Sequence, residues 1–286
     1  MKIILSPNPY RDRGLKTAQA AARILKEAGV ETRFCLPFEP DPRFELPKHL
    51  TYAEINQEIP TADLLICFGG DGTLLHAAKV AYSYDVPIMG VNMGSVGFMA
   101  ELEHSELQQL SRLAKGDYTI ERRMMLDVSL IHERREIYSE HALNDAAITK
   151  GAVARVVELS VCSDGELISS LSGDGVLVST PTGSTAYSLS AGGPIVEPTA
   201  QNIIITPICA HILQSKSFVL SKDRTVEIRL GRQARKTAYL SVDGGRAIRL
   251  SSGDLIRIRR SERSISLVRL TGRSFYQILL SKLGKS

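Results

Sequence analysis

A glycine-rich turn with a single carboxylate is the first segment of this chain whose residue types could do chemistry. The turn, residues 69–73, reads Gly-Gly-Asp-Gly-Thr and lies between an apolar run, Ala62 to Phe68, and a helix-like segment, Leu74 to Ala81. Its glycines let the backbone approach an anionic ligand, and the amides that open the helix can face phosphate oxygens. Asp71 is then placed to accept a proton from an attacking hydroxyl or to hold a metal ion. A plain Asp-Gly turn is the alternative, but a place after a buried strand favours function, because open α/β sheets bind ligands there.

A second polar cluster lies in the middle of the chain. Asp174 stands between two glycines, and an apolar strand then runs into Thr-Pro-Thr-Gly-Ser-Thr-Ala-Tyr at residues 180–187. Hydroxyls and main-chain amides of this kind can donate to phosphate or sugar oxygens, and Tyr187 could stack on a planar ring. A Ser/Thr-rich surface turn with a helix cap is the alternative interpretation.

Two further segments are ambiguous on residue types alone. Asn144-Asp145 is a polar pair in an apolar context. It is either a turn or a ribose-binding pair, because a carboxylate can accept from two vicinal hydroxyls. Gly90 to Phe98 is a glycine-rich loop after a strand, but its spacing does not give the GxGxxG dinucleotide fingerprint. It is therefore either a flexible connection or a ligand loop.

The elements that would position these residues change character along the chain. The first half alternates strand and helix signals, with strands at Lys2 to Leu5, Glu31 to Cys35 and Pro87 to Val91 and an amphipathic helix over Leu15 to Lys26. Apolar strands in this rhythm predict an α/β domain with a parallel sheet covered on both faces. From about Arg122, short Val-, Ile- and Ser-rich segments recur between turn signals, which predicts a β-rich, sandwich-like domain.

The predicted boundaries follow this change of character. We expect one domain over residues 1–122 and a second over 123–270. The second would end with two separate strands, Leu255 to Arg259 and Ile265 to Leu270. Helical spacing of apolar residues from Phe275 to Leu283 predicts a closing helix, and the segment 271–286 is expected to complete the first domain.

Composition excludes several classes of protein. With 286 residues, a net charge of +4 and 43% hydrophobic residues, the chain has the profile of a globular protein. No apolar stretch suits a bilayer span or a secretion signal, so we expect a cytoplasmic protein that binds neither membranes nor nucleic acid. The cysteines are far apart and form no CxxC pair, which predicts buried free thiols at Cys35, Cys67, Cys162 and Cys209.

Taken in order, the motifs resemble those of the NAD kinase family. The set comprises the Gly-Gly-Asp-Gly-Thr turn, Gly90 to Phe98, Asn144-Asp145, the segments 173–175 and 180–187, and Gly192-Gly193-Pro194. Lipid kinases and phosphofructokinases carry similar turns, so the ordered set, from about Ile66 to Gly245, carries the resemblance. It implies an α/β nucleotide-binding domain and a β-rich NAD-binding domain, with a dinucleotide site often shared between the subunits of a homodimer or homotetramer.

The resemblance also implies a reaction and a role for each residue. A phosphoryl group would pass from ATP or polyphosphate, with Mg²⁺ or another divalent ion, to the 2′-hydroxyl of the adenosine ribose of NAD, giving NADP. Asp71 would be the general base, Asn144 and Asp145 would hold the ribose, Phe98 would lie near the adenine, and Asp174 would reach the nicotinamide side. The other expected nucleotide-binding residues are Gly70, Gly72, Thr73, Thr182, Ser184, Thr185, Ala186 and Tyr187. No residue is assigned as a metal ligand.

Some positions depart from the family pattern or stay open. Asp145 stands where many relatives have glutamate, and Met99-Ala100 stands where they have leucine and threonine. The residue that would contact the donor phosphates is open among Arg122, Arg123 and Arg155.

Three alternative functions compete with this prediction. A lipid kinase could use the same turn, but no basic amphipathic helix supports it. A dinucleotide sensor could keep the pocket without turnover, and a dehydrogenase would need the missing fingerprint.

Overall fold

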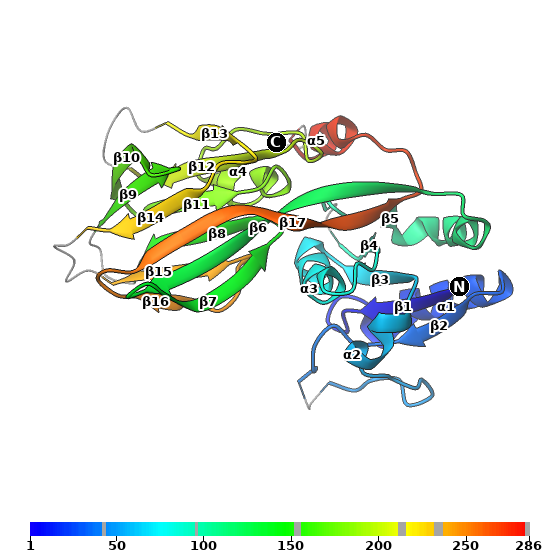
Figure 1. Cartoon of the computed structure of the whole chain (residues 1–286). Helices are drawn as coiled ribbons and strands as arrows, with labels where there is room; N and C mark the ends of the chain where they lie inside the picture. The colour runs from blue at the N-terminus through cyan, green and yellow to red at the C-terminus, as the bar shows by residue number, and fades with distance from the viewer. Residues whose placement is uncertain (42–43, 95–96, 152–155, 211–215, 232–236, 284–286) are drawn as a thin grey trace. The chain divides into compact units, whose positions relative to one another are not determined.

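The computed structural model describes all residues except 42–43, 95–96, 152–155, 211–215, 232–236 and 284–286 (Figure 1). The chain forms two compact units. The first comprises Met1–Arg122 and Ile265–Ser286, and the second comprises Arg123–Ser264. Each unit is described by itself below.

A parallel sheet forms the centre of the first unit. Its strands are β1 (Lys2–Pro7), β2 (Glu31–Phe34), β3 (Leu64–Gly69), β4 (Ile88–Asn92) and β5 (Leu102–Glu103). β1 pairs with β2 and β3, and β4 pairs with β3 and β5, in each case in parallel. Every residue of β3 and β4 is buried, which is the pattern of parallel strands covered on both faces. The expected parallel α/β sheet is confirmed.

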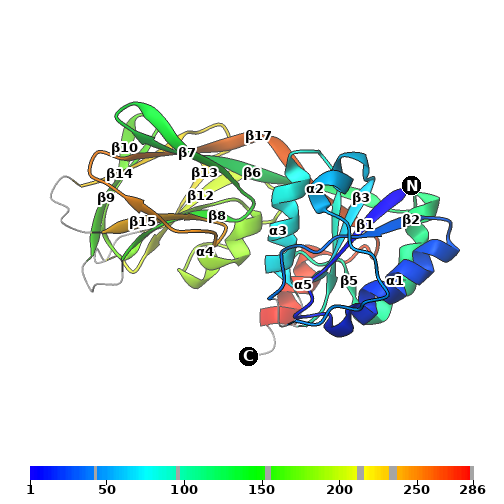
Figure 2. The same ribbon diagram turned by 90° about the horizontal axis from the view of Figure 1, so that it is seen from below.

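Helices supply the cover. The helical segments of this unit are η1 (Arg13–Leu15), α1 (Lys16–Glu27), α2 (Ile55–Glu58), η2 (Ile59–Thr61), α3 (Asp71–Tyr82), η3 (His104–Lys115) and α5 (Phe275–Leu283). Apolar residues of α1 and η3, such as Leu25 and Leu110, share one core with Ile3, Ile66 and Val91 of the sheet. α3 packs on β3 and β4, and Figure 2 shows α5 in red at the end of the chain.

The second unit is built from antiparallel strands in two sheets. Its strands are β6 (Thr119–His132), β7 (Arg135–Ala142), β8 (Asp145–Lys150), β9 (Val157–Ser163), β10 (Glu166–Gly173), β11 (Gly175–Ser179), β12 (Asn202–Ile208), β13 (Phe218–Ser221), β14 (Val226–Leu230), β15 (Ala238–Val242), β16 (Ile248–Leu250) and β17 (Leu255–Arg269). The first residues of β6, up to Arg122, and the last residues of β17, from Ile265, belong to the first unit. One sheet has the order β13-β12-β11-β8-β15-β16, and the other contains β10-β9-β14-β17 with β6 and β7. Inward side chains of both sheets form one apolar core, so the expected β-rich fold is confirmed. The short helices η4 (Thr182–Thr185) and α4 (Tyr187–Ser190) follow β11.

The end of the sequence departs from expectation at one strand. The two predicted strands at 255–259 and 265–270 are a single strand, β17, and the prediction of a break was wrong. The polar run from Ser261 to Ser264 does not interrupt β17, because this strand pairs with β6. Figures 1 and 2 show the two strands side by side. Ser261 is itself buried. Pairing supplies partners for the backbone groups of the strand whatever the side chains are.

The cysteine prediction holds only in part. Cys35 and Cys67 are buried, and burial raises the pKa of each thiol to about 12. Cys162 is half-buried and Cys209 is exposed, so the expectation of four buried thiols was wrong. Cys209 comes directly after the last residue of β12 and has a positive φ of 44°, so it lies outside the sheet in which the strand is buried. Within the described residues, no helix has the length and apolar character needed to cross a membrane.

Candidate active site

The glycine-rich turn of the first unit leads from β3 directly into α3. The helix begins at Asp71, three residues before the predicted start at Leu74, and Gly70 precedes it in an extended conformation. Asp71, Gly72 and Thr73 therefore form the first turn of the helix, where the helix dipole favours negative charge. The amide of Thr73 bonds to the carbonyl of Gly70 at 2.9 Å, whereas the first amides of a helix have no carbonyl one turn back. This is a suitable place for an anionic ligand.

The loop after β4 holds the carboxylate of Asp71. Oδ2 accepts a hydrogen bond from the amide of Phe98 at 2.9 Å, and Oδ1 accepts one from the amide of Met99 at 3.2 Å. Gly97 lies so close that a Cβ there would stand 2.3 Å from Oδ1. The loop therefore fixes the orientation of Asp71 and leaves no room for a side chain at position 97.

Gly97→Ala is expected to displace the Asp71 carboxylate. With Asp71 as the expected general base, kcat should fall about 10- to 100-fold, because small misplacements of a catalytic group are costly. Steady-state assays of the expected phosphoryl transfer would measure this fall. The matched control is Gly94→Ala on the same loop, since a Cβ at Gly94 would meet no atom within 4 Å. Equal activity of the two variants would contradict the close fit at Gly97.

The hydroxyl of Thr73 is occupied within the unit. Its Oγ1 accepts from Nδ2 of Asn8 at 3.1 Å, and a Cβ on Gly69 would lie only 2.2 Å from that oxygen. Asn8 was not predicted from the sequence. Its position directly after the first strand is the signal that could have indicated it, because ligand-binding residues gather at the carboxyl ends of parallel strands.

Phe98 is half-buried and contacts the closing helix. The Nζ of Lys282 lies 4.0 Å from the centroid of the Phe98 ring, and the Phe275 ring lies 6.5 Å away. α5 thus places a cation next to the residue whose amide bonds Asp71.

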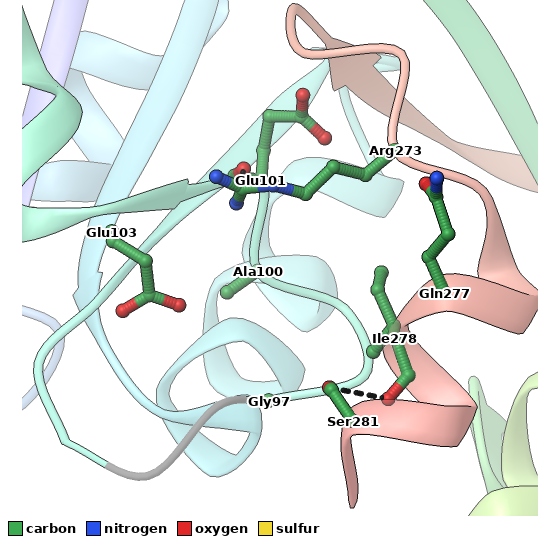
Figure 3. Close-up of a pocket in the computed structure, with 8 residues that line it drawn as sticks. All are labelled: Gly97, Ala100, Glu101, Glu103, Arg273, Gln277, Ile278 and Ser281. Atoms are coloured by element: carbon green, nitrogen blue, oxygen red, sulfur yellow. Dashed lines mark hydrogen bonds between the residues drawn. The ribbon is translucent and has the colours of Figure 1, made fainter.

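A cavity of about 540 Å³ adjoins this loop (Figure 3). Its lining residues are Gly97, Ala100, Glu101, Glu103, Arg273, Gln277, Ile278 and Ser281. Arg273 donates to the carbonyl of Glu101 at 3.4 Å and pairs with Glu106, while Glu103 accepts from Asn92 at 2.9 Å. One side of the loop therefore borders open space.

In the second unit, the polar pair at the start of β8 is held by an aspartate that the sequence did not identify. The carboxylate of Asp243 accepts from the amides of Leu143, Asn144 and Asp145 at 2.8 to 3.0 Å. Asn144 and Asp145 are 9% and 6% exposed. Burial first, and the charge of Asp243 second, raise the pKa of Asp145 to about 7.

The segment after β11 packs closely on this pair. The amide of Thr180 donates to the carbonyl of Asn144 at 2.9 Å, and a Cβ on Gly183 would lie 2.1 Å from the same carbonyl oxygen. The backbone of η4 therefore touches the backbone of Asn144, and residues 144–145 and 182–187 share one end of the sheet, where Asp145 pairs with Ser179.

The predicted binding residues from Ser184 to Tyr187 differ in whether their side chains are free to contact a ligand. The hydroxyl of Ser184 bonds to the main chain of Pro181 and Val196, so it serves the local fold. Thr185 donates to the carbonyl of Thr182 at 3.2 Å. Ala186 is half-buried and Tyr187 is 44% exposed, which leaves the Tyr187 ring accessible to a ligand.

Asp174 lies at the other end of β11. It precedes β11 and forms an ion pair at 2.6 Å with Lys150, which is the last residue of β8, at the end of the strand opposite to Asp145. At about 3.3 Å per residue, the five residues of β11 separate the two ends by roughly 16 Å. The structure therefore does not bring Asp174 together with the other predicted residues of this unit.

The three arginines proposed for the donor phosphates have different surroundings. Arg123 is 3% exposed and donates to Oγ1 of Thr182 at 3.1 Å. Arg122 belongs to the first unit, and Arg155 lies outside the described residues. In the part of the chain that the structure describes, no group of three His, Cys, Asp or Glu residues gathers as a metal site would require.

Comparison with protein families decides the relationship. The model of the ATP-NAD kinase N-terminal domain matches residues 3–118, and that of the C-terminal domain matches residues 143–270. The chain belongs to the NAD kinase family. An NAD kinase of Acetivibrio thermocellus is 34% identical over 284 residues, covering 99% of this chain and 97% of that protein. One of Lachnoclostridium phytofermentans is 42% identical over 241 residues, covering 82% and 84%.

Solved structures of an NADH kinase and of an NAD kinase share this fold. A crystal structure of yeast NADH kinase complexed with NADH has a TM-score of 0.86 and 26% identity, over 100% of this chain and 88% of that chain. An NAD kinase from Archaeoglobus fulgidus in complex with ATP has a TM-score of 0.76 and 24% identity, over 99% of both chains, and supports the fold. The chain is thus an enzyme with the NAD kinase fold, and its reaction is the phosphorylation of NAD.

Proposed function

We propose that Asp71 is the general base that accepts a proton from the 2′-hydroxyl of the adenosine ribose of NAD, so that the product is NADP. The observation that carries this proposal is the fixed carboxylate of Asp71 at the start of α3, held by the amides of Phe98 and Met99. A carboxylate in a defined orientation, next to amides that suit phosphate, meets the main needs of phosphoryl transfer, which are alignment and charge stabilisation.

The phosphoryl donor in this proposal is ATP or polyphosphate together with Mg²⁺. Mg²⁺ is commonly held by one or two carboxylates and by substrate phosphates, so the donor set here would be Asp71 and the phosphate oxygens. The ion would draw charge from the phosphates during transfer. Gly70, Gly72 and Thr73 would bring main-chain amides to the phosphates at the start of α3.

In the second unit, Asn144 and Asp145 would hold the adenosine ribose. The buried carboxylate of Asp145 suits two vicinal hydroxyl donors, because a buried acceptor needs partners. Thr182, Ser184, Thr185, Ala186 and Tyr187 would line the dinucleotide site around the ribose, although the hydroxyls of Ser184 and Thr185 already have main-chain partners. Asp174, at the far end of β11, would face the nicotinamide, and Phe98 would lie near the adenine.

This role of Asp145 predicts a pH dependence for NAD binding. A carboxyl with a pKa of about 7 is mostly neutral at pH 6 and mostly ionised at pH 8. If the ionised form binds the two hydroxyls, the affinity for NAD should fall about fivefold between pH 7 and pH 6, in proportion to the ionised fraction. Burial is the main cause of this raised pKa, and Asp243 is the charged neighbour that adds to it, whereas Ser179, opposite on β11, carries no charge.

Titration calorimetry with NAD from pH 5.5 to 8.5 would measure this dependence. Asp145→Asn has no carboxyl to titrate, and we expect it to bind more weakly with an affinity that is flat over the same range. A wild-type affinity that is independent of pH would contradict the role of Asp145.

One assay separates the proposed reaction from its rivals. The purified protein is incubated with NAD, Mg²⁺ and either ATP or polyphosphate, and NADP is measured with an NADP-specific dehydrogenase. NADP formed with one donor identifies that donor. No NADP with either donor, with NAD binding intact, would favour a dinucleotide sensor, and phosphorylation of a lipid would favour a lipid kinase.

We also infer a homodimer or homotetramer and a cytoplasmic location. The family likeness supports the first, and the composition supports the second. Light scattering and cell fractionation would test them.

A further inference from the structure

The carboxylate of Glu101 is the most heavily bonded side chain near the proposed base. Glu101 is 5% exposed. Its Oε1 accepts from the amide of Leu270 at 2.8 Å and from the amide and hydroxyl of Thr271 at 2.5 and 2.7 Å. Its Oε2 accepts from the guanidinium of Arg269 at 3.2 Å. A buried carboxylate with this many donors fixes the backbone on both sides of the contact.

These contacts join the loop that holds Asp71 to the last part of the chain. Arg269 also donates to the carbonyl of Met99 at 3.3 Å, and its remaining nitrogens bond to Glu121 at 2.8 and 3.1 Å. The amide of the same residue, Met99, donates to Asp71. Only one residue, Met99, therefore separates the Arg269 guanidinium from the proposed base.

A cavity lies on the other side of this loop. The cavity of about 540 Å³ borders Gly97 and Ala100 there, and the residues that face them across it, Gln277 and Ser281, belong to α5 (Figure 3). Beside the contact of Phe98 with α5, the loop is held by the contacts of Glu101 and Arg269 and by the bond from the Glu101 amide to the carbonyl of Gly90 at 2.8 Å.

We infer that Glu101, with Arg269 and Thr271, positions Asp71 for phosphoryl transfer by fixing the amides of Phe98 and Met99. Glu101 is a positioning residue, because its carboxylate acts through the loop and contacts Asp71 nowhere. The inference rests on the proposed role of Asp71 as the base.

The test compares kcat and KM in five single variants and a double mutant. Glu101→Gln keeps the size of the side chain but loses the charge that holds Arg269. We expect kcat to fall about 10- to 100-fold, because misplacement of a catalytic group costs rate, while KM for NAD stays within about twofold. Arg269→Lys should lower kcat in the same way, because lysine cannot reproduce the forked contacts of arginine. Thr271→Val removes one donor to Glu101 and should lower kcat severalfold; it replaces Glu101→Gln in the series if that variant does not fold.

Two comparisons distinguish positioning from a general structural effect. Glu106→Gln removes a carboxylate charge that pairs with Arg273 on the rim of the same cavity, and it should keep wild-type kcat. In an Asp71→Asn background, Glu101→Gln should cause no further loss, since its effect passes through the missing carboxylate. The inference is overturned if Glu101→Gln matches Glu106→Gln, or if it lowers kcat by the same factor with and without Asp71. If Asp71→Asn alone is fully active, the assignment of Asp71 as the base fails. That result can be told apart from the two outcomes that would overturn the role of Glu101.

Discussion

Asp71→Asn is expected to lower kcat by about 10²- to 10⁴-fold, the usual contribution of a general acid or base. Asparagine keeps the size of the side chain but only one of the two amide hydrogen bonds, because Phe98 and Met99 donate to different oxygens of Asp71 and the asparagine nitrogen cannot accept. The rest of the turn is unchanged, so folding and NAD affinity should stay close to wild type. NADP formation under saturating NAD and ATP is the measurement, with melting temperature and NAD titration beside it.

The matched control is Asp85→Asn, beyond the other end of α3. Asp85 is exposed and has a positive φ of 55°, a conformation that asparagine tolerates. That variant should turn over like wild type. Turnover by Asp71→Asn at the rate of the control would remove Asp71 from the mechanism.

Gly183→Ala is the second change for which we expect a large effect. Its Cβ would lie 2.1 Å from the carbonyl oxygen and 2.5 Å from the carbonyl carbon of Asn144, and both are backbone atoms that cannot move away alone. Overpacking of this kind usually costs about 1–3 kcal/mol of stability. Because the displaced backbone is that of the proposed ribose-binding pair, KM for NAD should rise at least about tenfold, from the loss of one or two hydrogen bonds.

Urea unfolding and NAD titration would measure the two effects. Gly231→Ala is the comparison, since its Cβ would stand 3.2 Å from a side-chain atom of Glu158 and lies away from Asn144. It should bind NAD normally. If Gly183→Ala binds NAD as tightly as Gly231→Ala does, the contact between η4 and Asn144 does not shape the site.

The fold class could be predicted from the sequence because a strand that is buried on both faces has a continuous apolar run. Every residue from Leu64 to Gly69 is buried, and the continuous apolar run that results is what predicted a parallel strand there. The start of α3 was harder to predict, because the Gly-Asp-Gly sequence is poor in helix propensity. The hydrogen bonds from Thr73 and Leu74 to the carbonyl of Gly70 nevertheless begin the helix there.

The least predictable parts of the site are those that join distant segments. Asp243 reads as a turn residue, and its carboxylate reaches Asp145 across 98 residues only because β8 and β15 are neighbours. The contact between Glu101 and Thr271 spans 170 residues. The sequence around one partner contains no pattern that indicates the other. Such contacts depend on which strands are neighbours in the fold and cannot be predicted from the spacing of residues along the chain.

The first unit is built from two segments that are far apart in the sequence, Met1–Arg122 and Ile265–Ser286, and this has a consequence for protein synthesis. The contact between Glu101 and Thr271 spans 170 residues, so the ribosome makes Gly69 to Glu101 well before Arg269, Leu270 and Thr271, which hold the loop beside Asp71. A nascent chain can therefore form β1, β3 and α3 before this loop has those contacts. With Asp71 as the proposed base, activity should appear only after residues 265–271 have left the ribosome and paired beside β4, so chains that terminate before them should be inactive.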